Sequence, residues 1–138
     1  MAKIREIRCI RTRASGIWVI VKVITDQPGL YGIGSASDVN HAPTVITAIE
    51  EVIAPHLIGR DASHIEDIWQ TIYTSAYWRN GSILNTALGG IDMALWDIKG
   101  KEAGMPVHQL LGGPCRSAVP CYAHAGGNDL EALLDAIH

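Results

Sequence analysis

The sequence predicts an α+β fold: a three-stranded antiparallel meander, then a helical bundle, then the opening of a β/α unit. Three observations support this prediction. The first third of the chain is rich in β-branched residues and contains a Pro-Gly turn signal. The middle carries apolar residues at helical spacing. The end combines an alternating segment, a Gly-Gly pair and a helix-capping pattern.

The meander is predicted from residues 3–13, which mix isoleucine with charge, and residues 17–25, which are β-branched almost throughout. Pro28 and Gly29 fit the centre of a type II turn, because proline fixes the first φ and glycine permits the positive second one. A third strand is expected near residues 30–36.

Two glycine patterns predict close packing. Gly32 and Gly34 lie two apart, so one face of the third strand lacks side chains there. Gly89 and Gly90 interrupt a helical pattern, although each glycine costs about 1 kcal/mol relative to alanine in a helix. A tight crossing against another element and close approach to a ligand both explain this pair, and packing is the favoured interpretation.

The middle of the chain predicts three helices. In the first, Val45, Ile49 and Val52 form one stripe and Pro55 marks the exit. The second is expected to start at a capping box formed by Ser63 and Glu66 and to run to about Trp78. The third carries a stripe made of Leu84, Leu88, Ile91, Leu95 and Ile98.

Residues 118–124 alternate between an apolar face and a mixed face, and a glycine loop and a helix capped by Asn128 are expected to follow. His124 would then lie at the carboxyl end of a strand, where β/α barrels place their active sites. A barrel needs about 250 residues. We therefore expect two parts, residues 1–117 as one domain and residues 118–138 as the first strand and helix start of a truncated barrel.

Composition argues against several classes of function. Apolar residues make up 48% of the chain, and the net charge is −3 with no basic face, so nucleic-acid and membrane-surface binding are not expected. The three cysteines form no CxxC pair, which favours reduced thiols. The first residues lack the apolar run of a signal peptide, and IWVIV is too short to cross a membrane. These features predict a soluble, cytoplasmic protein.

No self-contained catalytic or metal motif emerges from the residues. GxGxxG, P-loop and GxSxG patterns are absent. His64 and Asp67 have a spacing that suits a shared metal, but without a further ligand nearby they are interpreted as solvated residues. Asp92 and Asp97 point in different directions on a helix, which favours separate polar contacts.

Asn40 and His124 each leave two interpretations open. Asn40 precedes a predicted helix and is explained by capping its first turn, while His124 is explained by a hydrogen-bonded structural role. The second interpretation for each residue is a contact with a polar ligand. The residues alone favour the structural interpretations.

The segment AYWRNGSILNTALGGIDMALWDIKGKEAGMPVHQLLGG (residues 76–113) closely resembles the end of the amino-terminal capping domain in the mandelate racemase-like branch of the enolase superfamily. HLIGRDASHIEDIWQTIY (56–73) and YGIGSASDVN (31–40) agree with it in order and spacing. The runs YWRNG and YAHAGG are similar to the mannonate/gluconate dehydratase group, which includes proteins labelled starvation-sensing. The resemblance covers essentially the whole chain.

This resemblance implies a capping domain followed by a modified β/α barrel, in a homo-oligomeric lyase of carbohydrate acid metabolism. In the family, Mg²⁺ held by three barrel carboxylates stabilises an enediolate, a base removes the proton next to the carboxylate, and the 3-hydroxyl leaves. The substrate class is a small sugar acid similar to D-mannonate or D-gluconate. The resemblance places the metal ligands and the acid/base residues beyond this chain, so the fragment alone is expected to be inactive and to bind no metal.

The resemblance also assigns site residues. Asn40 matches the family's substrate-contacting asparagine after the third strand, and His124 matches its substrate-contacting histidine at the end of the first barrel strand. Trp78 and Arg79 are hypothesised to wall the site, and this role is not carried over from the family. The sugar acid itself is not predicted.

The alternative is a non-catalytic binding or interaction module derived from such an enzyme. The last helix would expose an apolar side that has no barrel to cover it, consisting of Leu130, Leu133, Leu134 and Ile137. An isolated chain of this kind is expected to associate through that side.

Overall fold

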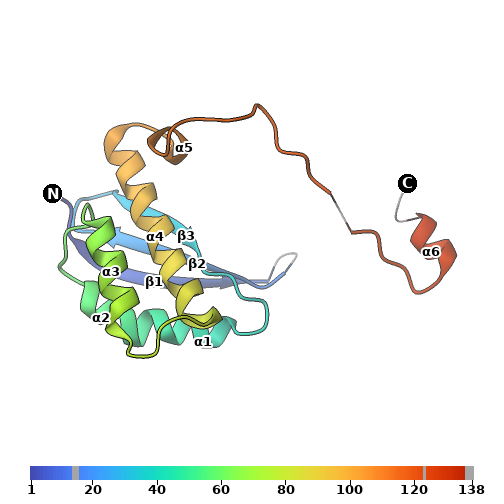
Figure 1. Ribbon diagram of the computed structural model, residues 1–138, viewed down its shortest axis with the longest axis horizontal. Helices are drawn as coiled ribbons and strands as arrows, with labels where there is room; N and C mark the ends of the chain where they lie inside the picture. Colours follow the sequence, from blue (N-terminus) through green and yellow to red (C-terminus); the bar gives the residue numbers. More distant parts are fainter. Residues whose placement is uncertain (14–15, 123, 136–138) are drawn as a thin grey trace.

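The computed structural model describes residues 1–13, 16–122 and 124–135. Its elements are β1 (Ile4–Thr12), β2 (Trp18–Thr25), β3 (Tyr31–Ser35), α1 (Ala42–Thr47), the π-helical segment η1 (Ala48–Ile53), α2 (Ala54–Leu57), α3 (Ile65–Ser75), α4 (Ser82–Ala103), α5 (Val107–Leu110) and α6 (Leu130–Asp135). Figure 1 shows two layers, in which the helices up to α4 cover one face of the sheet and the segment after α5 extends away from both layers. This confirms the predicted α+β fold of a meander followed by helices. Within the described residues, no helix combines the length and the apolar character needed to cross a membrane.

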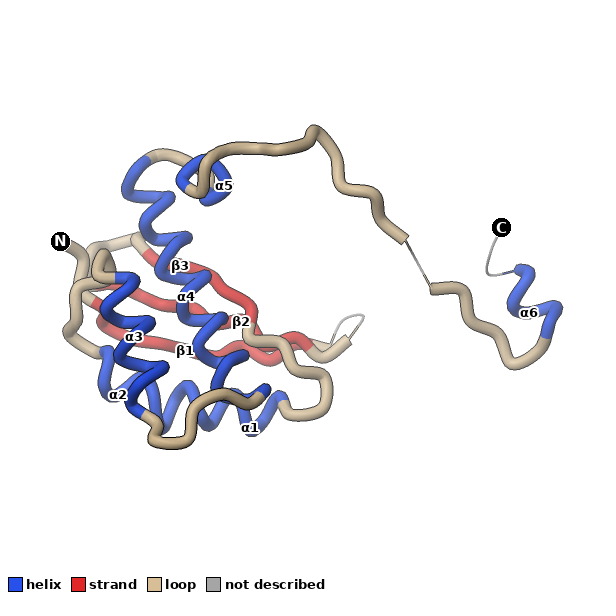
Figure 2. The backbone as a smooth tube through the Cα atoms, viewed as in Figure 1, coloured by secondary structure: helices blue, strands red, loops and turns tan. Residues whose placement is uncertain are grey.

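The sheet is an antiparallel meander in the order β1-β2-β3 (Figure 2). The predicted turn joins β2 to β3: the Leu30 amide donates to the Gln27 carbonyl at 3.2 Å, and Gly29 has φ of 80°. The buried face of β2 consists of Val19, Val21, Val23 and Thr25. The strand packs against α4 and α1. Alternation along β2 therefore sets which sheet face receives the helices.

The long helix α4 lies against the sheet and buries the predicted stripe. Leu88, Ile91, Leu95 and Ile98 are buried, and Leu84 is partly buried. The helix ends where Gly104 adopts a left-handed φ of 63°, and the Met105 amide donates to the Gly100 carbonyl at 2.9 Å. This helix end is a Schellman motif, which provides hydrogen-bond donors to the last carbonyls of the helix.

Backbone-to-backbone contact joins β3 to α4. A β-carbon added to Gly34 would stand 1.9 Å from the Gly90 carbonyl oxygen, and one added to Gly32 would stand 1.8 Å from that of Ala94. A β-carbon on Gly90 would meet the Ala36 side chain at 2.7 Å. The predicted close packing is confirmed for these three glycines, whereas a β-carbon on Gly89 would meet no atom within 4 Å.

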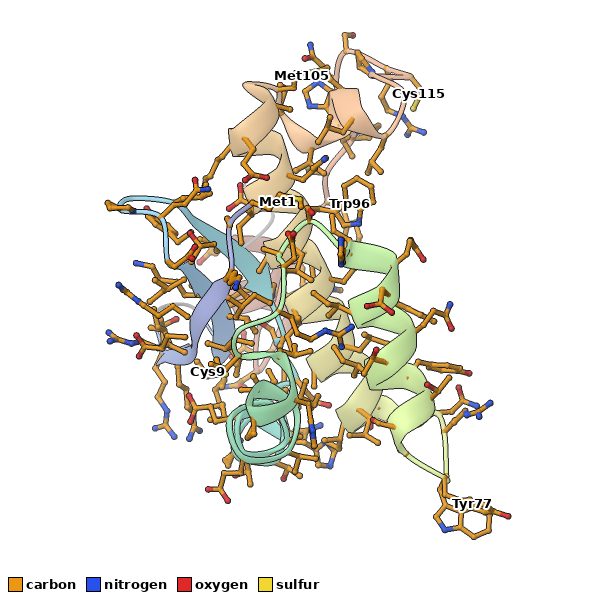
Figure 3. The ribbon with its side chains drawn as sticks, turned by 90° about the vertical axis from the view of Figure 1, so that its left-hand side faces the viewer. Met1, Cys9, Tyr77, Trp96, Met105 and Cys115 are labelled. Carbon is orange, nitrogen blue, oxygen red and sulfur yellow. The ribbon has the colours of Figure 1, made fainter. Side chains whose placement is uncertain are left out.

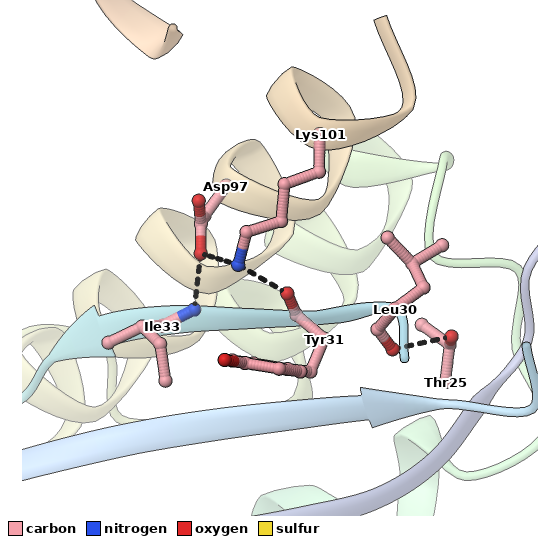
Figure 4. A network of polar contacts seen from close by, with 6 residues as sticks. All are labelled: Thr25, Leu30, Tyr31, Ile33, Asp97 and Lys101. Atoms are coloured by element: carbon pink, nitrogen blue, oxygen red, sulfur yellow. Dashed lines mark hydrogen bonds and ion pairs between the residues drawn. The ribbon is translucent and has the colours of Figure 1, made fainter. Parts of the chain in front are cut away.

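The free edge of β3 is covered by side chains of α4 (Figure 4). Asp97 accepts a hydrogen bond from the Ile33 amide at 2.8 Å, and Lys101 donates to the Tyr31 carbonyl at 2.7 Å. Lys101 also bonds Asp97 at 2.8 Å. The prediction that Asp97 makes its own polar contact is confirmed. These bonds occupy edge groups that would otherwise be open to another strand.

The first predicted helix differs from expectation in its register. Val45 and Ile49 are buried, but Val52 is 57% exposed and Ile53 takes its place in the core. The reason is η1, because a π-helical turn holds an extra residue and rotates the following side chains. The prediction that Pro55 marks the helix exit is wrong, because the helical path continues from η1 through Pro55 to Leu57 in α2.

The predicted capping box at Ser63 and Glu66 is wrong. The N-cap residue of α3 is His64, and no side chain caps the helix. Instead, the Ser63 hydroxyl donates to the Asp61 carboxylate at 2.8 Å, and the Ser63 amide donates to the same oxygen at 2.9 Å. Because the Ser63 hydroxyl bonds Asp61 within a local turn, it does not cap α3.

The described part of residues 118–124 pairs with no strand in this chain, so the first barrel strand stays a prediction, and Ala123 lies outside the described residues. Residues 118–122 and 124 are exposed and belong to no sheet. A strand is stabilised by a ladder with a neighbouring strand, and none adjoins this segment. Helix α6 begins at Leu130 rather than at Asn128.

The two neighbouring glycines of α4 provide a matched test of the packing. Gly90→Ala is expected to lower the free energy of unfolding by about 1–3 kcal/mol, because the new methyl group overlaps Ala36 and Val21. Gly89→Ala is expected to raise it by about 0.5–1 kcal/mol, because the methyl group meets open space and alanine favours the helix. Urea denaturation of both variants measures the two effects, and equal effects would contradict the contact.

Candidate functional site

The loop that carries Asn40 joins β3 to α1 and is organised by Asp38. One carboxylate oxygen of Asp38 accepts from the Asn40 amide at 3.0 Å and from the His41 amide at 2.9 Å, and it lies 3.1 Å from the His41 ring nitrogen Nδ1. The hydrogen bond from the His41 amide is the main cause that lowers the pKa of Asp38. Asp38 thus holds the backbone on both sides of the Asn40 side chain.

Asn40 is exposed and does not cap α1. The N-cap residue is His41, which has no capping side chain, and the Val45 amide donates to the His41 carbonyl at 3.0 Å. The capping interpretation of Asn40 is therefore wrong, because Asp38 supplies the local acceptor. No hydrogen bond of the Asn40 side chain is found within the described part of the chain, so its amide faces solvent with both polar atoms available.

The same loop is tied to the sheet just before Asn40. The Ala36 amide donates to the Val19 carbonyl at 2.8 Å, and the Val19 amide donates to the Ser37 hydroxyl at 3.1 Å. Ser35 and Ser37 share a hydrogen bond of 2.9 Å. These bonds continue the ladder beyond β3 and fix where the chain leaves the sheet.

His124 lies in the extended segment that follows α5 (Figure 1). Its ring is exposed and contacts the Tyr122 ring edge-to-face, with 5.1 Å between the centroids. None of the contacts found among the described residues joins His124 to Asn40. The structure therefore does not bring the two predicted substrate contacts together.

Trp78 and Arg79 lie in the loop between α3 and α4. Tyr77 and Trp78 pack edge-to-face at 5.0 Å and are 87% and 82% exposed. Figure 3 shows Tyr77 at the outer tip of this loop, pointing away from the helices. The Arg79 guanidinium lies 5.9 Å from the centre of the Tyr73 ring.

A pocket of about 400 Å³ adjoins this loop, between η1 and α2 on one side and α3 and α4 on the other. Arg79 and Asn80 line it, whereas Asn40, Trp78 and His124 do not. Its apolar wall consists of Val52, Ile53, Leu57, Ile72, Leu84 and Leu88, and no acidic side chain lines it. Arg79 is therefore the predicted site residue that lines this pocket.

Asp67, Asp92 and Cys9 lie in structural environments rather than in a shared site. Asp67 pairs with Arg60, and the pKa of Asp92 is raised by burial and by the nearby Glu66 carboxylate. Burial and the Glu50 carboxylate raise the pKa of the Cys9 thiol to about 12, which leaves it a poor nucleophile at neutral pH. Among the described residues, no group of three or more His, Cys, Asp or Glu side chains is placed to hold a metal.

Sequence reasoning missed Asp38, the residue that organises the candidate loop. A signal was present, because an aspartate that closely precedes a helix commonly accepts the backbone amides of a turn. The cap was instead assigned to Asn40, which stands nearer to the predicted helix. The choice between two Asx residues that lie two positions apart depends on backbone geometry that the sequence pattern does not specify.

The arrangement of strands and helices defines a class of protein. A three-stranded antiparallel meander whose one face is covered by a helical layer, with an extended segment leaving after it, is the arrangement of an enolase-type capping domain. Residues 6–112 match the sequence profile of the mandelate racemase / muconate lactonizing enzyme family, N-terminal domain. The chain belongs to this family, which confirms the resemblance inferred from the sequence.

Individual relatives are similar over nearly the whole chain. A D-galactonate dehydratase family member of Paenibacillus sp. (strain JDR-2) is 67% identical over 138 residues, which are 100% of this chain and 34% of the relative. Another, from Musicola paradisiaca (strain Ech703), is 55% identical over 98% of this chain and 33% of its own. The chain thus spans about one third of the length of these relatives.

A solved structure is similar in both sequence and fold. The crystal structure of an enolase from Pantoea ananatis with bound D-gluconate and Mg is 48% identical and superposes with a TM-score of 0.90. The match covers 99% of this chain and 33% of that chain.

The loop held by Asp38 is expected to respond to pH. Because hydrogen bonds lower the pKa of Asp38 in the folded state, the carboxylate stabilises the fold above about pH 4 and loses this effect as the pH falls through the folded pKa. Asp38→Ala should therefore lower the melting temperature at pH 7 and have a smaller effect near about pH 3. Asp38→Asn, which keeps an acceptor oxygen, is the control, and it should lose less at pH 7. A loss from Asp38→Ala that is equal at both pH values would contradict this role.

Proposed function

We propose that this chain is the amino-terminal capping part of a magnesium-dependent sugar-acid dehydratase whose substrate is similar to D-gluconate or D-mannonate. The observation that carries the proposal is the likeness to the Pantoea ananatis enolase with bound D-gluconate and Mg, which extends over 99% of this chain. The proposed reaction removes the proton next to the carboxylate and expels the 3-hydroxyl. We also propose that the protein is homo-oligomeric and cytoplasmic.

The proposed role of this chain is to bind and enclose the substrate. Asn40 offers an amide donor and acceptor to a hydroxyl or carboxylate of the sugar acid, from a loop held by Asp38 and Ser37. His124 offers an imidazole from the segment that leaves the domain. Trp78 and Arg79 remain proposed as a wall, supported by their exposure rather than by contact with Asn40.

Magnesium, when bound, supplies stabilisation of negative charge that develops on the substrate. The described residues of this chain do not fit such a site, since none of their acidic, histidine or cysteine side chains form a group of three. We therefore propose that the metal ligands and the acid/base residues belong to the part that the longer relatives possess, and that the 138-residue chain alone is inactive.

A second candidate function is a non-catalytic binding or interaction module. The observation that favours it is α6, in which Leu130 is 71% exposed and Leu134 is 49% exposed. A short helix with exposed leucines needs a partner surface. The intact mass of the polypeptide in its source cells separates the two candidates. A mass severalfold above 14.9 kDa favours the dehydratase, and a mass near 14.9 kDa favours the module.

The dehydratase proposal predicts magnesium-dependent conversion of D-gluconate or D-mannonate to a 2-keto-3-deoxy acid by the protein as its source cells make it. Asn40→Ala and His124→Asn should each lower kcat/KM by about 10- to 100-fold, the size of a lost hydrogen bond to a charged group. Asn128→Ala, a change outside the proposed site, is the control. Unchanged kinetics in both site variants, with magnesium-dependent turnover intact, would remove these residues from the site, and absence of turnover would remove the proposal.

A further inference from the structure

The loop between β3 and α1 holds an aspartate and a histidine whose side chains contact each other. The Asp38 oxygen that accepts from the Asn40 and His41 amides also lies 3.1 Å from Nδ1 of the His41 ring. One carboxylate oxygen therefore fixes the backbone of Asn40 and the ring of His41 together. The Cα atoms of these two neighbours stand about 3.8 Å apart, so a sugar acid that contacts Asn40 is long enough to reach His41.

Burial separates the roles of the pair. The Asp38 side chain is 17% exposed, whereas the His41 side chain is 55% exposed. Asp38 already accepts from donors of its own loop, which suits an orienting role. Among the described residues, no hydrogen bond is found for Nε2, the second ring nitrogen of His41. Nε2 is therefore the polar atom of the pair that is available to a ligand.

The ionisation of Asp38 determines which nitrogen of the histidine ring carries the proton. Hydrogen bonds, chiefly the one from the His41 amide, hold the pKa of Asp38 below its usual value, so the carboxylate is ionised at neutral pH. An ionised carboxylate only accepts hydrogen bonds. Nδ1 of His41 must then be the donor, and in the neutral ring Nε2 keeps a lone pair and acts as an acceptor.

We propose that His41, oriented by Asp38, is a second substrate-binding residue of this loop, and that its Nε2 accepts a hydrogen bond from a hydroxyl group of the sugar acid that Asn40 contacts. This inference rests on the dehydratase proposal for its substrate. Asp38 is a positioning residue, because it acts through the His41 ring and does not itself contact the substrate.

The charge of the loop favours a hydroxyl group over the carboxylate of the substrate. Within the described part of the chain, Asp38 forms an ion pair with His41 and with no lysine or arginine. A substrate carboxylate at Nε2 would be repelled by the Asp38 carboxylate and would find no proton on the neutral ring. A hydroxyl group carries no charge and supplies the hydrogen that Nε2 accepts.

Nuclear magnetic resonance of the 138-residue chain, labelled with ¹⁵N at histidine, tests the tautomer without any substrate. At about pH 8, where histidine is mostly neutral, the His41 signals should show a protonated Nδ1 and an unprotonated Nε2. The spectrum of His41→Gln assigns these signals, and Asp38→Ala should lower the share of this tautomer. A His41 ring with its proton on Nε2 in the wild-type chain would overturn the proposal.

Steady-state kinetics of the protein as its source cells make it test the contact itself. His41→Ala should raise KM for D-gluconate or D-mannonate by about 3- to 10-fold, the size of one neutral hydrogen bond. It should change kcat by less than about 2-fold, because a contact away from the reacting atoms is made equally in the ground state and the transition state. His41→Gln, whose amide oxygen can accept from the same hydroxyl, should recover most of the affinity. His108→Ala, a change to an exposed histidine in α5, is the matched control and should leave KM unchanged.

A double-mutant cycle separates positioning by Asp38 from simple support of the loop. Asp38→Asn keeps an oxygen for the two backbone amides and removes the charge that selects the ring proton. It should raise KM in the wild-type background and have no further effect in the His41→Ala background, because the ring that Asp38 orients is absent there. Equal effects in both backgrounds would leave Asp38 a structural role alone and would overturn its positioning role.

Failure of this inference is distinguishable from failure of the proposed function. Magnesium-dependent turnover by the wild-type protein, together with an unchanged KM in His41→Ala, would overturn the His41 contact alone. Absence of turnover in the wild-type protein would remove the dehydratase proposal and this inference with it.

Discussion

The contact between the backbones of β3 and α4 is the constraint on which the rest of this domain depends. Gly34 and Gly90 leave no room for a β-carbon between strand and helix, and the carbonyl of Ala94 lies equally close to Gly32. Such an approach brings the backbone of the long helix against the sheet and aligns its buried stripe with the valines of β2. Asp97 and Lys101, one turn apart on the same helix, then reach the edge of β3.

The position of the candidate site depends on this contact. The chain leaves β3 directly after the glycine contact. The Ala36 amide donates to the Val19 carbonyl and the Val19 amide donates to the Ser37 hydroxyl, so the ladder extends up to the loop that presents Asn40. The α3–α4 loop is placed by the start of α4 at the same time. One helix thus sets where two exposed polar or aromatic loops stand, and the proposed enclosure of the substrate uses groups that it positions.

The sequence predicted those features whose physical cause is local or has a clear residue signature. Strand composition and turn chemistry predicted the meander. The spacing of Gly32 and Gly34 predicted a close approach, which for Gly34 is made by the Gly90 backbone. The π-helical turn that moves Val52 out of the core has no such signature, because it depends on how the helix fits the sheet. Residues 118–124 carry a strand pattern, but their described part pairs with no strand. At the site, Asn40 was identified by resemblance, whereas Asp38, which holds its loop, was missed because side-chain acceptors in turns are chosen by backbone geometry.

Native-state hydrogen exchange at the Ile33 amide tests the central contact most directly. This amide lies on the outer edge of the sheet, and among the described residues its partner is the Asp97 carboxylate on α4 rather than another strand. If α4 is fixed against β3 as described, the amide should exchange only on opening that separates strand from helix, with protection close to that of the central strand β2. Exchange as fast as that of the exposed Gly126 amide would show that the helix does not hold the edge of β3, and the account of the fold would fail with it.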